Sequence, residues 1–127
     1  MGLGNVFNIA GSAMNAESTR INLSASNIAN KNNIAGSDDE AYKSMKPLFR
    51  LDKNGGVEVV NIVESARPSK VINYPSHPLA DKDGNVYGSN VVDEDEMADV
   101  TSATKSYELN AEVLNSIKQL MIKTIQF

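Results

Sequence analysis

His77 is the first residue of this 127-residue chain to consider for catalysis. It is the only histidine, and it lies between two prolines in YPSHPLAD with no acid or base at a spacing that identifies a partner. A histidine paired with a serine would indicate nucleophilic catalysis, but serine and aspartate occur throughout the chain and single out no pair. We interpret His77 as a surface-loop residue and predict no catalytic residue; a hydrolase that uses His77 is the alternative.

Alternating oxygen-bearing side chains in DKDGN suggest calcium binding. Asp81, Asp83 and Asn85 match the first ligand positions of a calcium loop. That loop also needs a glycine at its sixth position and a bidentate glutamate at its twelfth, where this chain has Val86 and Val92. A hairpin turn at the Asp-Gly step explains the same residues, because glycine readily adopts the positive φ that many turns require.

The acidic run Asp93–Glu96 is the last candidate for a metal site. No histidine or spaced set of carboxylates accompanies it, and the chain has no cysteine to supply thiolate ligands. Carboxylates interact favourably with the free N–H groups at the start of a helix, so we predict that the run begins a helix. With no tryptophan and no phosphate-binding glycine loop, we expect no cofactor, no metal and no small-molecule substrate.

Charge and hydropathy narrow the choice of partners. The net charge is -4 with acidic and basic residues intermixed, so the basic patch of a nucleic-acid-binding protein is missing and we expect no nucleic acid partner. No apolar run is long enough to predict a membrane-spanning helix. The first positively charged side chain is Arg20, and asparagines interrupt the apolar residues before it. A cleavable secretory signal is therefore not expected.

Proline and glycine divide the chain into three segments. All four prolines lie between residues 31 and 93, and neither proline nor glycine occurs from Glu94 to Phe127. This distribution predicts helices at both ends of the chain and strands and turns in the middle. We predict an α+β fold in which long N- and C-terminal helices pack as a coiled-coil-like pair beside a small β-rich middle region. The expected boundaries are 1–30, 31–93 and 94–127.

The N-terminal helix, about residues 3–30, repeats an apolar residue every seven positions, which predicts a seam that packs against another helix. The members of this seam are Phe7, Met14, Ile21 and Ile28. A second stripe beside it consists of Asn8, Asn15 and Asn22. This stripe is either a solvated face or a second packing face, where neutral amides meet neighbouring chains without burying charge.

The C-terminal helix, about residues 95–126, carries two apolar rows, which indicates more than one neighbour. The first row, the seam, consists of Val100, Tyr107, Leu114 and Met121. The second row consists of Leu109, Val113, Leu120 and Phe127. The alternative is one broad face packed on the chain's own middle. We predict that the two seams form an assembly interface. We also predict that both ends are largely disordered in the unassembled chain and become ordered when neighbouring chains cover the asparagine stripe and the second row.

The middle segment contains hairpin signals. A strand, a turn and a second strand are predicted from the stretch LFRLDKNGGVEVV, in which Asn54-Gly55-Gly56 would supply the residues of positive φ. Val71, Ile72 and Tyr74 indicate a further short strand that ends at Pro75. A unit of this size forms only a small β structure.

The two ends together resemble the family of bacterial flagellar rod and hook proteins. SASNIANKNN contains the family's asparagine signature at Asn27, Ile28, Ala29 and Asn30, and TSATKSYELNAEVLNSIKQLMIKTI is similar to its terminal helix around Ser106, Tyr107 and Asn110. Lys105 stands where the family commonly has arginine. The resemblance covers nearly the whole chain and is weakest at about residues 36–70.

The resemblance implies a structural subunit of the proximal rod of the flagellar basal body. Such a subunit self-assembles through its terminal helices into a helical tube that crosses the periplasm, transmits torque and houses the export channel. The implied partners are copies of itself, other rod proteins, the flagellar export apparatus and basal-body ring components. Export without a cleavable signal peptide is implied as well. The alternatives are another axial subunit, from the rod or the hook, and a helical-hairpin adaptor that binds one partner helix.

Overall fold

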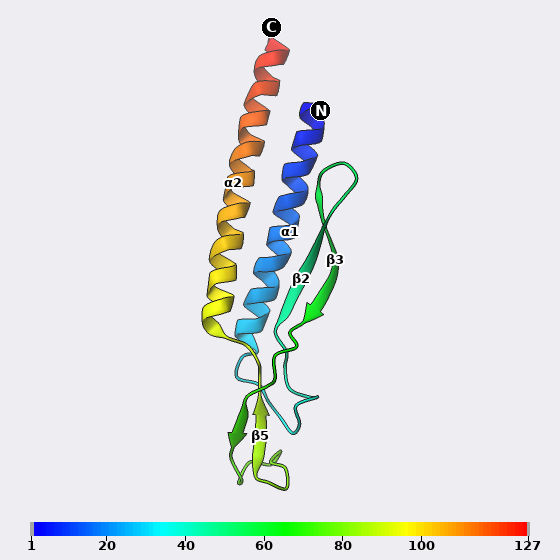
Figure 1. Cartoon of the computed structure of the whole chain (residues 1–127). Helices are drawn as coiled ribbons and strands as arrows, with labels where there is room; N and C mark the ends of the chain where they lie inside the picture. The colour runs from blue at the N-terminus through cyan, green and yellow to red at the C-terminus, as the bar shows by residue number, and fades with distance from the viewer. Residues whose placement is uncertain (1, 127) are drawn as a thin grey trace.

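A computed structural model describes residues 2–126 and has the predicted α+β architecture, with a long helix at each end and strands between them (Figure 1). In chain order the elements are α1 (Leu3–Ala29), β1 (Ile34–Ala35), β2 (Met45–Leu51), β3 (Val57–Glu64), β4 (Val71–Asn73), β5 (Asn85–Gly88) and α2 (Asp93–Gln126). Neither helix combines the length and apolarity that crossing a membrane would require, as far as residues 2–126 show.

The two helices lie side by side and run in opposite directions, so that both chain ends lie at the same end of the molecule (Figure 1). At ~1.5 Å per residue, α1 is about 40 Å long and α2 about 51 Å. Helix α2 packs along α1, and its buried side chains include Ala103 and Ile117. Small residues, Ala10 and Ala16, are buried on α1, and Ala16 lies beside Val57 and Val59 of the chain's β-hairpin.

Strands β2 and β3 form an antiparallel hairpin that packs along α1. Its pairing runs from Met45↔Glu64 to Leu51↔Val57, with a bulge after Leu48. The predicted turn lies between the strands, but of its three proposed positive-φ residues only Gly55 has one, at 90°, so the prediction was wrong for Asn54 and Gly56. Instead, Asp52 Oδ1 accepts the N–H groups of Asn54 and Gly56, at 2.8 and 2.9 Å, and closes a five-residue loop.

A second sheet lies at the end of the molecule remote from the termini. Its antiparallel strands have the order β1-β5-β4, and the connection from β4 to β5 contains the predicted turn at Gly84, whose φ is 79°. Asp81 Oδ1 accepts the N–H groups of Asp83 and Asn85, both at 2.9 Å, which repeats the arrangement around Asp52. We call residues 34–44 and 69–89 the distal lobe.

The most deeply buried side chains are mainly small or polar rather than large and apolar. Among the described residues, the largest that are fully buried are Glu96, Val86, Val91, Asn27, Ser24 and Ser89. Four of these six are polar, so hydrogen bonds must satisfy them for burial to be tolerated. The bonds gather where α1 ends and α2 begins, and that region is described next.

Candidate assembly interface and the polar junction behind it

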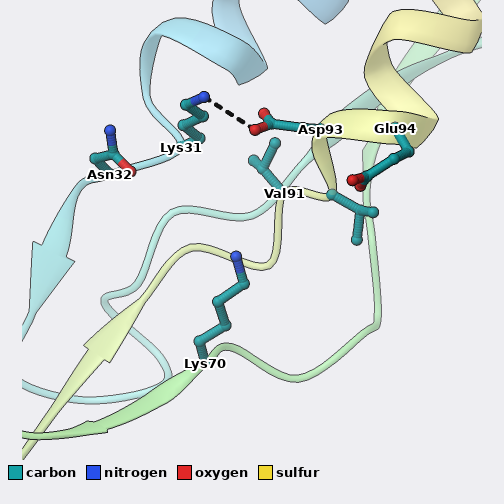
Figure 2. Close-up of a pocket in the computed structure, with 7 residues that line it drawn as sticks. Lys31, Asn32, Lys70, Val91, Asp93 and Glu94 are labelled. Carbon is teal, nitrogen blue, oxygen red and sulfur yellow. Dashed lines mark hydrogen bonds and ion pairs between the residues drawn. The ribbon is translucent and has the colours of Figure 1, made fainter.

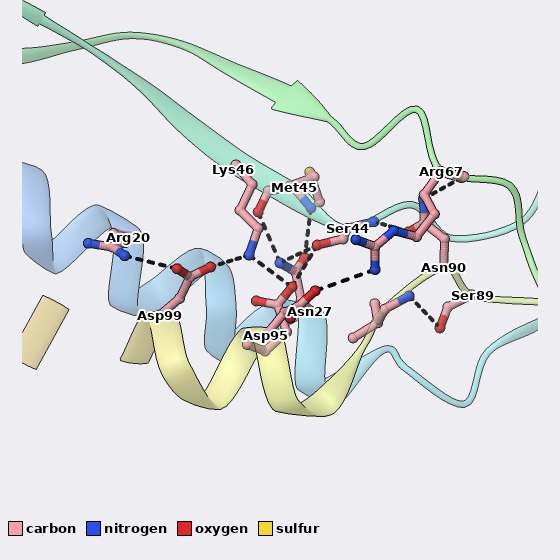
Figure 3. Close-up of polar contacts among 12 residues, drawn as sticks. Arg20, Asn27, Ser44, Met45, Lys46, Arg67, Ser89, Asn90, Asp95 and Asp99 are labelled. Carbon is pink, nitrogen blue, oxygen red and sulfur yellow. Dashed lines mark hydrogen bonds and ion pairs between the residues drawn. The ribbon is translucent and has the colours of Figure 1, made fainter. Parts of the chain in front are cut away.

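Asn27, the first residue of the asparagine signature, lies at the centre of a buried hydrogen-bonded cluster (Figure 3). Its side-chain amide donates to Ser44 Oγ at 3.1 Å and to the Met45 carbonyl at 2.9 Å. Its oxygen accepts the Tyr42 hydroxyl at 2.9 Å and the Met45 N–H at 3.0 Å. All of these hydrogen bonds tie the end of α1 to the chain that enters β2.

Asn90 closes the other side of this cluster, which we call the polar junction: Asn27, Ser44, Asn90 and Glu96. Its side-chain oxygen accepts the Ser44 N–H at 2.6 Å, and its amide donates to the carbonyl of Arg67 at 2.8 Å. The junction therefore connects four segments: α1, the start of β2, the connection to β4, and α2. The sequence did not single out Asn90, and the only available signal was its position a few residues before the predicted C-terminal helix.

Glu96 brings α2 into the polar junction. Its Oε1 accepts the Ser44 hydroxyl at 2.6 Å and Lys46 Nζ at 3.1 Å, although the side chain is only 1% exposed. Burial by itself would raise the pKa of this carboxyl group, but the hydrogen bonds from Ser44 and Lys46 outweigh it and the pKa is lowered. The charged form is therefore the one that fits the folded chain.

A ladder of alternating charges continues from the junction along the helix pair. Lys46 contacts Asp99 as well as Glu96, and Asp99 Oδ1 accepts Arg20 Nη2 at 2.9 Å (Figure 3). Desolvation opposes ionisation of Asp99, but Arg20 and Lys46 outweigh it and lower its pKa. The ladder fixes β2, α2 and α1 relative to one another.

The acidic run occupies the first turn of α2, as predicted. It does more than begin the helix, because Asp93 pairs with Lys31 at 2.9 Å and Asp95 with Arg67 at 3.4 Å. A surface pocket of about 420 Å³ lies beside the Lys31–Asp93 pair (Figure 2). The rest of its wall consists of Asn32, Lys70, Val91, Val92 and Glu94.

The residues first considered for chemistry have structural partners. His77 Nδ1 accepts the Leu79 N–H at 3.0 Å within the loop of the distal lobe. Asp81 uses Oδ1 for backbone N–H groups and Oδ2 for the Tyr87 hydroxyl, at 3.1 Å, and the Asn85 N–H is the main cause of its lowered pKa. No group of three or more metal-ligating side chains occurs within residues 2–126.

The seam residues lie along the helix pair but only partly inside it. Met14, Ile21, Ile28, Val100 and Leu114 are half-buried, while Phe7, Tyr107 and Met121 are exposed. Of the remaining signature residues, Asn30 ends α1 and donates to the Ser26 carbonyl, Ala29 is exposed, and Asn110 donates to the Ser106 carbonyl, both bonds at 2.8 Å.

The second apolar row of α2 and the asparagine stripe of α1 are both exposed to solvent in the described chain. Leu109, Val113 and Leu120 are 52%, 43% and 53% exposed, and the asparagine stripe of α1 is exposed too. Phe127, the last member of the second row, lies outside the described residues. Within the described chain this row does not pack on the middle segment, in contrast to the alternative of one broad intramolecular face. The two helices thus present an apolar row and a neutral amide stripe that the chain itself leaves uncovered.

Long antiparallel terminal helices with uncovered faces, a small β middle and the asparagine signature define the class of flagellar axial proteins. Residues 82–127 match the family described as "Flagellar basal body rod FlgEFG protein C-terminal". The chain is 42% identical over 130 residues to the flagellar basal-body rod protein FlgC of Salmonella typhimurium, and 42% identical to that of Escherichia coli O6:H1. It is 43% identical over 132 residues to the FlgC of Buchnera aphidicola subsp. Schizaphis graminum. Each comparison covers 98% of this chain and 97% of its relative. The chain belongs to the family of flagellar basal-body rod proteins FlgC.

Proposed function

We propose that this chain is a structural subunit of the proximal rod of the flagellar basal body, and that it assembles with copies of itself through the outer faces of α1 and α2. The family assignment supports a rod subunit rather than a hook subunit or a helical-hairpin adaptor. The observation that carries the mode of assembly is the exposed row of α2, because large apolar side chains at this density mark a surface that a partner covers. No reaction is part of the proposal.

Neighbouring chains bury both outer faces in the assembled tube. The asparagine stripe of α1 carries no charge, so its burial avoids the cost of desolvating an ion. The polar junction and charge ladder hold each subunit's helices and hairpin in one arrangement, so that torque passes through a stiff unit. The seams contribute to the pair within a subunit as well as to the faces between subunits.

Other rod proteins, the export apparatus and basal-body ring components are the further partners we propose. The subunit reaches the periplasm through the flagellar export apparatus, without a cleavable signal peptide, and the assembled tube encloses the export channel. We also propose that residues 1–30 and 94–127 act as assembly helices and residues 31–93 as the body between them.

Variants of the outer faces test this function. Leu109→Asp and Asn15→Lys change exposed side chains, so the free energy of unfolding of the isolated chain should change by no more than about 0.5 kcal/mol. Each places a charge where a neighbour packs, so each variant should be lost from purified basal bodies, with loss of motility. Ser116→Asp, at an exposed polar position of α2, is the matched control and should assemble. If Leu109→Asp entered basal bodies normally, neighbouring chains would not cover this apolar row.

A further inference from the structure

The loop between β2 and β3 contains the only Asn-Gly step of the chain, Asn54-Gly55. This step is chemically reactive, because the glycine nitrogen can attack the asparagine carboxamide and glycine has no side chain to obstruct the approach. Both residues are exposed. Figure 1 shows the loop at the tip of the hairpin, where a Cβ at Gly55 would lie 3.4 Å from Ile9 Cδ1 of α1. A reactive pair is therefore open to water beside the first turns of α1.

The fold restrains the nitrogen that would attack. The Gly55 N–H donates to the Asp52 carbonyl at 3.1 Å, and Asp52 Oδ1 accepts the N–H groups on either side, those of Asn54 and Gly56. The attack requires the Gly55 nitrogen to lose its proton and turn toward the carboxamide, so the nitrogen must first leave this hydrogen bond. Exposed loops open at low free energy. The frequency with which Asp52 releases the loop therefore determines how fast the reaction runs.

A second loop in the distal lobe shows what one product of this reaction looks like. Its sequence at residues 81–85 is DKDGN, so that Asp83 stands at the position that corresponds to Asn54 in DKNGG. The Asp83 N–H donates to Asp81 Oδ1 at 2.9 Å, and the Gly84 N–H donates to the Asp81 carbonyl at 3.0 Å, which repeats the arrangement around Asp52. A carboxylate at this position therefore fits a loop of this kind.

We propose that Asn54 is a site of spontaneous deamidation and that Asp52 controls its rate. The Gly55 nitrogen bonds to Asn54 Cγ as the Cγ–Nδ2 bond breaks, and the side-chain nitrogen leaves as ammonia with the proton of the Gly55 amide. Water then opens the cyclic succinimide at Cγ to give aspartate, or at the backbone carbonyl carbon to give isoaspartate. Asparagine and water thus become an acid and ammonia, and no oxidant or enzyme takes part.

The reaction adds a negative charge beside a stretch of helix that has none, since α1 carries no charged side chain before Glu17. The aspartate product keeps the loop closed, as Asp83 does in the distal lobe. The isoaspartate product lengthens the backbone by one methylene group, so the hydrogen bonds to Asp52 no longer fit and the hairpin tip loosens from α1. Chains that remain longest before assembly acquire the most of both products.

Peptide mapping by mass spectrometry of the full-length, unassembled chain, incubated at mildly alkaline pH, tests the site. Asn54 should deamidate several-fold faster than Asn115, which is also exposed and precedes the small Ser116, but lies within α2 where helical hydrogen bonds hold the backbone. Asn54→Gln should abolish the reaction in the loop, because glutamine must close a larger ring. Methylation specific for isoaspartate should label the Asn54 peptide. Deamidation at Asn115 as fast as at Asn54 would overturn the proposed site.

Asp52→Ala tests the control of the rate. It should accelerate deamidation of Asn54 several-fold and leave Asn115 unchanged, whereas Asp52→Asn retains an oxygen acceptor and should stay close to the unsubstituted chain. The unsubstituted chain in urea gives the rate without the folded loop, which should exceed the rate in buffer. This comparison decides the question even where Asp52→Ala unfolds the whole chain and accelerates both sites. Equal rates at Asn54 in urea and in buffer would overturn the role of Asp52.

Discussion

At the scale of single residues, Asn27 shows how one side chain can organise several segments. An asparagine near the end of a helix commonly caps it or faces solvent, and here Asn30 takes the terminal position instead. Asn27 is 0% exposed and uses both its donor and its acceptor atoms on residues around β2. Its burial is therefore intramolecular, and the asparagines left for contact with other chains are those of the exposed stripe.

The first prediction concerns Asn27→Ala. This change removes the acceptor of the Tyr42 hydroxyl and of the Met45 N–H, and the donor to the Met45 carbonyl, while the Ser44 hydroxyl keeps its bond to Glu96. We therefore expect the free energy of unfolding to fall by about 2–4 kcal/mol. Urea denaturation followed by circular dichroism measures the change. Asn15→Ala, at an exposed position of the same helix, is the control and should differ little from the unsubstituted chain. Equal effects of the two substitutions would show that the Asn27 network contributes nothing to stability.

At the scale of elements, the sequence predicted helices and turns, which depend on neighbouring residues, better than contacts between distant residues. The seven-residue repeats predicted both helices because periodicity is a property of neighbouring residues. The glycines at 55 and 84 marked both turns, although Asp52 and Asp81 determine how the loops close. The role of these carboxylates in closing the loops was not foreseen, since an aspartate three residues before a turn glycine is common in many contexts.

Long-range polar contacts could not be derived from the sequence. Asn90 and Ser44 are 46 residues apart and meet only because the chain folds back twice. Neutral polar residues have no sequence period that indicates burial. The polar junction and the pairing of β1 with β5 therefore could not be predicted from the sequence. The acidic run Asp93–Glu96 was correctly predicted to begin a helix. Its sequence gave no indication that Glu96 is buried.

The second prediction concerns pH and the connection between α2 and β2. Glu96 and Asp99 have pKa values below the ordinary 4.5 and 3.8. The unfolded chain therefore binds more protons as the pH falls, and the stability that these carboxylates contribute is complete above about pH 4.5 and is lost below it. Urea titrations between pH 3 and pH 7 should show this loss for the unsubstituted chain and a smaller one for Glu96→Gln. A loss as large in Glu96→Gln as in the unsubstituted chain would contradict this prediction.

The third prediction concerns how closely the hairpin packs on α1. A Cβ atom at Gly56 would lie 2.8 Å from Ser12 Oγ and 2.8 Å from Asp52 Oδ2. Ser12 Oγ also accepts the Val57 N–H at 3.0 Å, so Gly56→Ala should push the hairpin from the helix and cost about 1–3 kcal/mol. Gly11→Ala is the control, since a Cβ there meets nothing within 4 Å and should stabilise the helix by about 0.5–1 kcal/mol. Thermal unfolding of both variants measures the difference, and a Gly56→Ala variant as stable as Gly11→Ala would disprove close packing.

At the scale of the whole molecule, stability is distributed unevenly along the helices. The polar junction and the charge ladder hold the first turns of α2 through Glu96 and Asp99. Farther along, α2 has α1 as its only neighbouring element, and many of its apolar side chains are exposed. The hairpin supports α1 over much of its length, so the two terminal helices should differ in their behaviour before assembly.

The fourth prediction therefore concerns hydrogen exchange of the dilute, unassembled chain. Segments with few buried contacts open at low free energy, so amides in residues 113–126 should exchange fastest among the helical amides, and those of residues 96–103 slowest. On incorporation into the rod, neighbouring chains cover the second row of α2, and residues 113–126 should become protected. Mass spectrometry of free chain and purified basal bodies measures both states. Strong and uniform protection along α2 in the free chain would contradict ordering on assembly, because a helix already stable by itself gains no order from its neighbours.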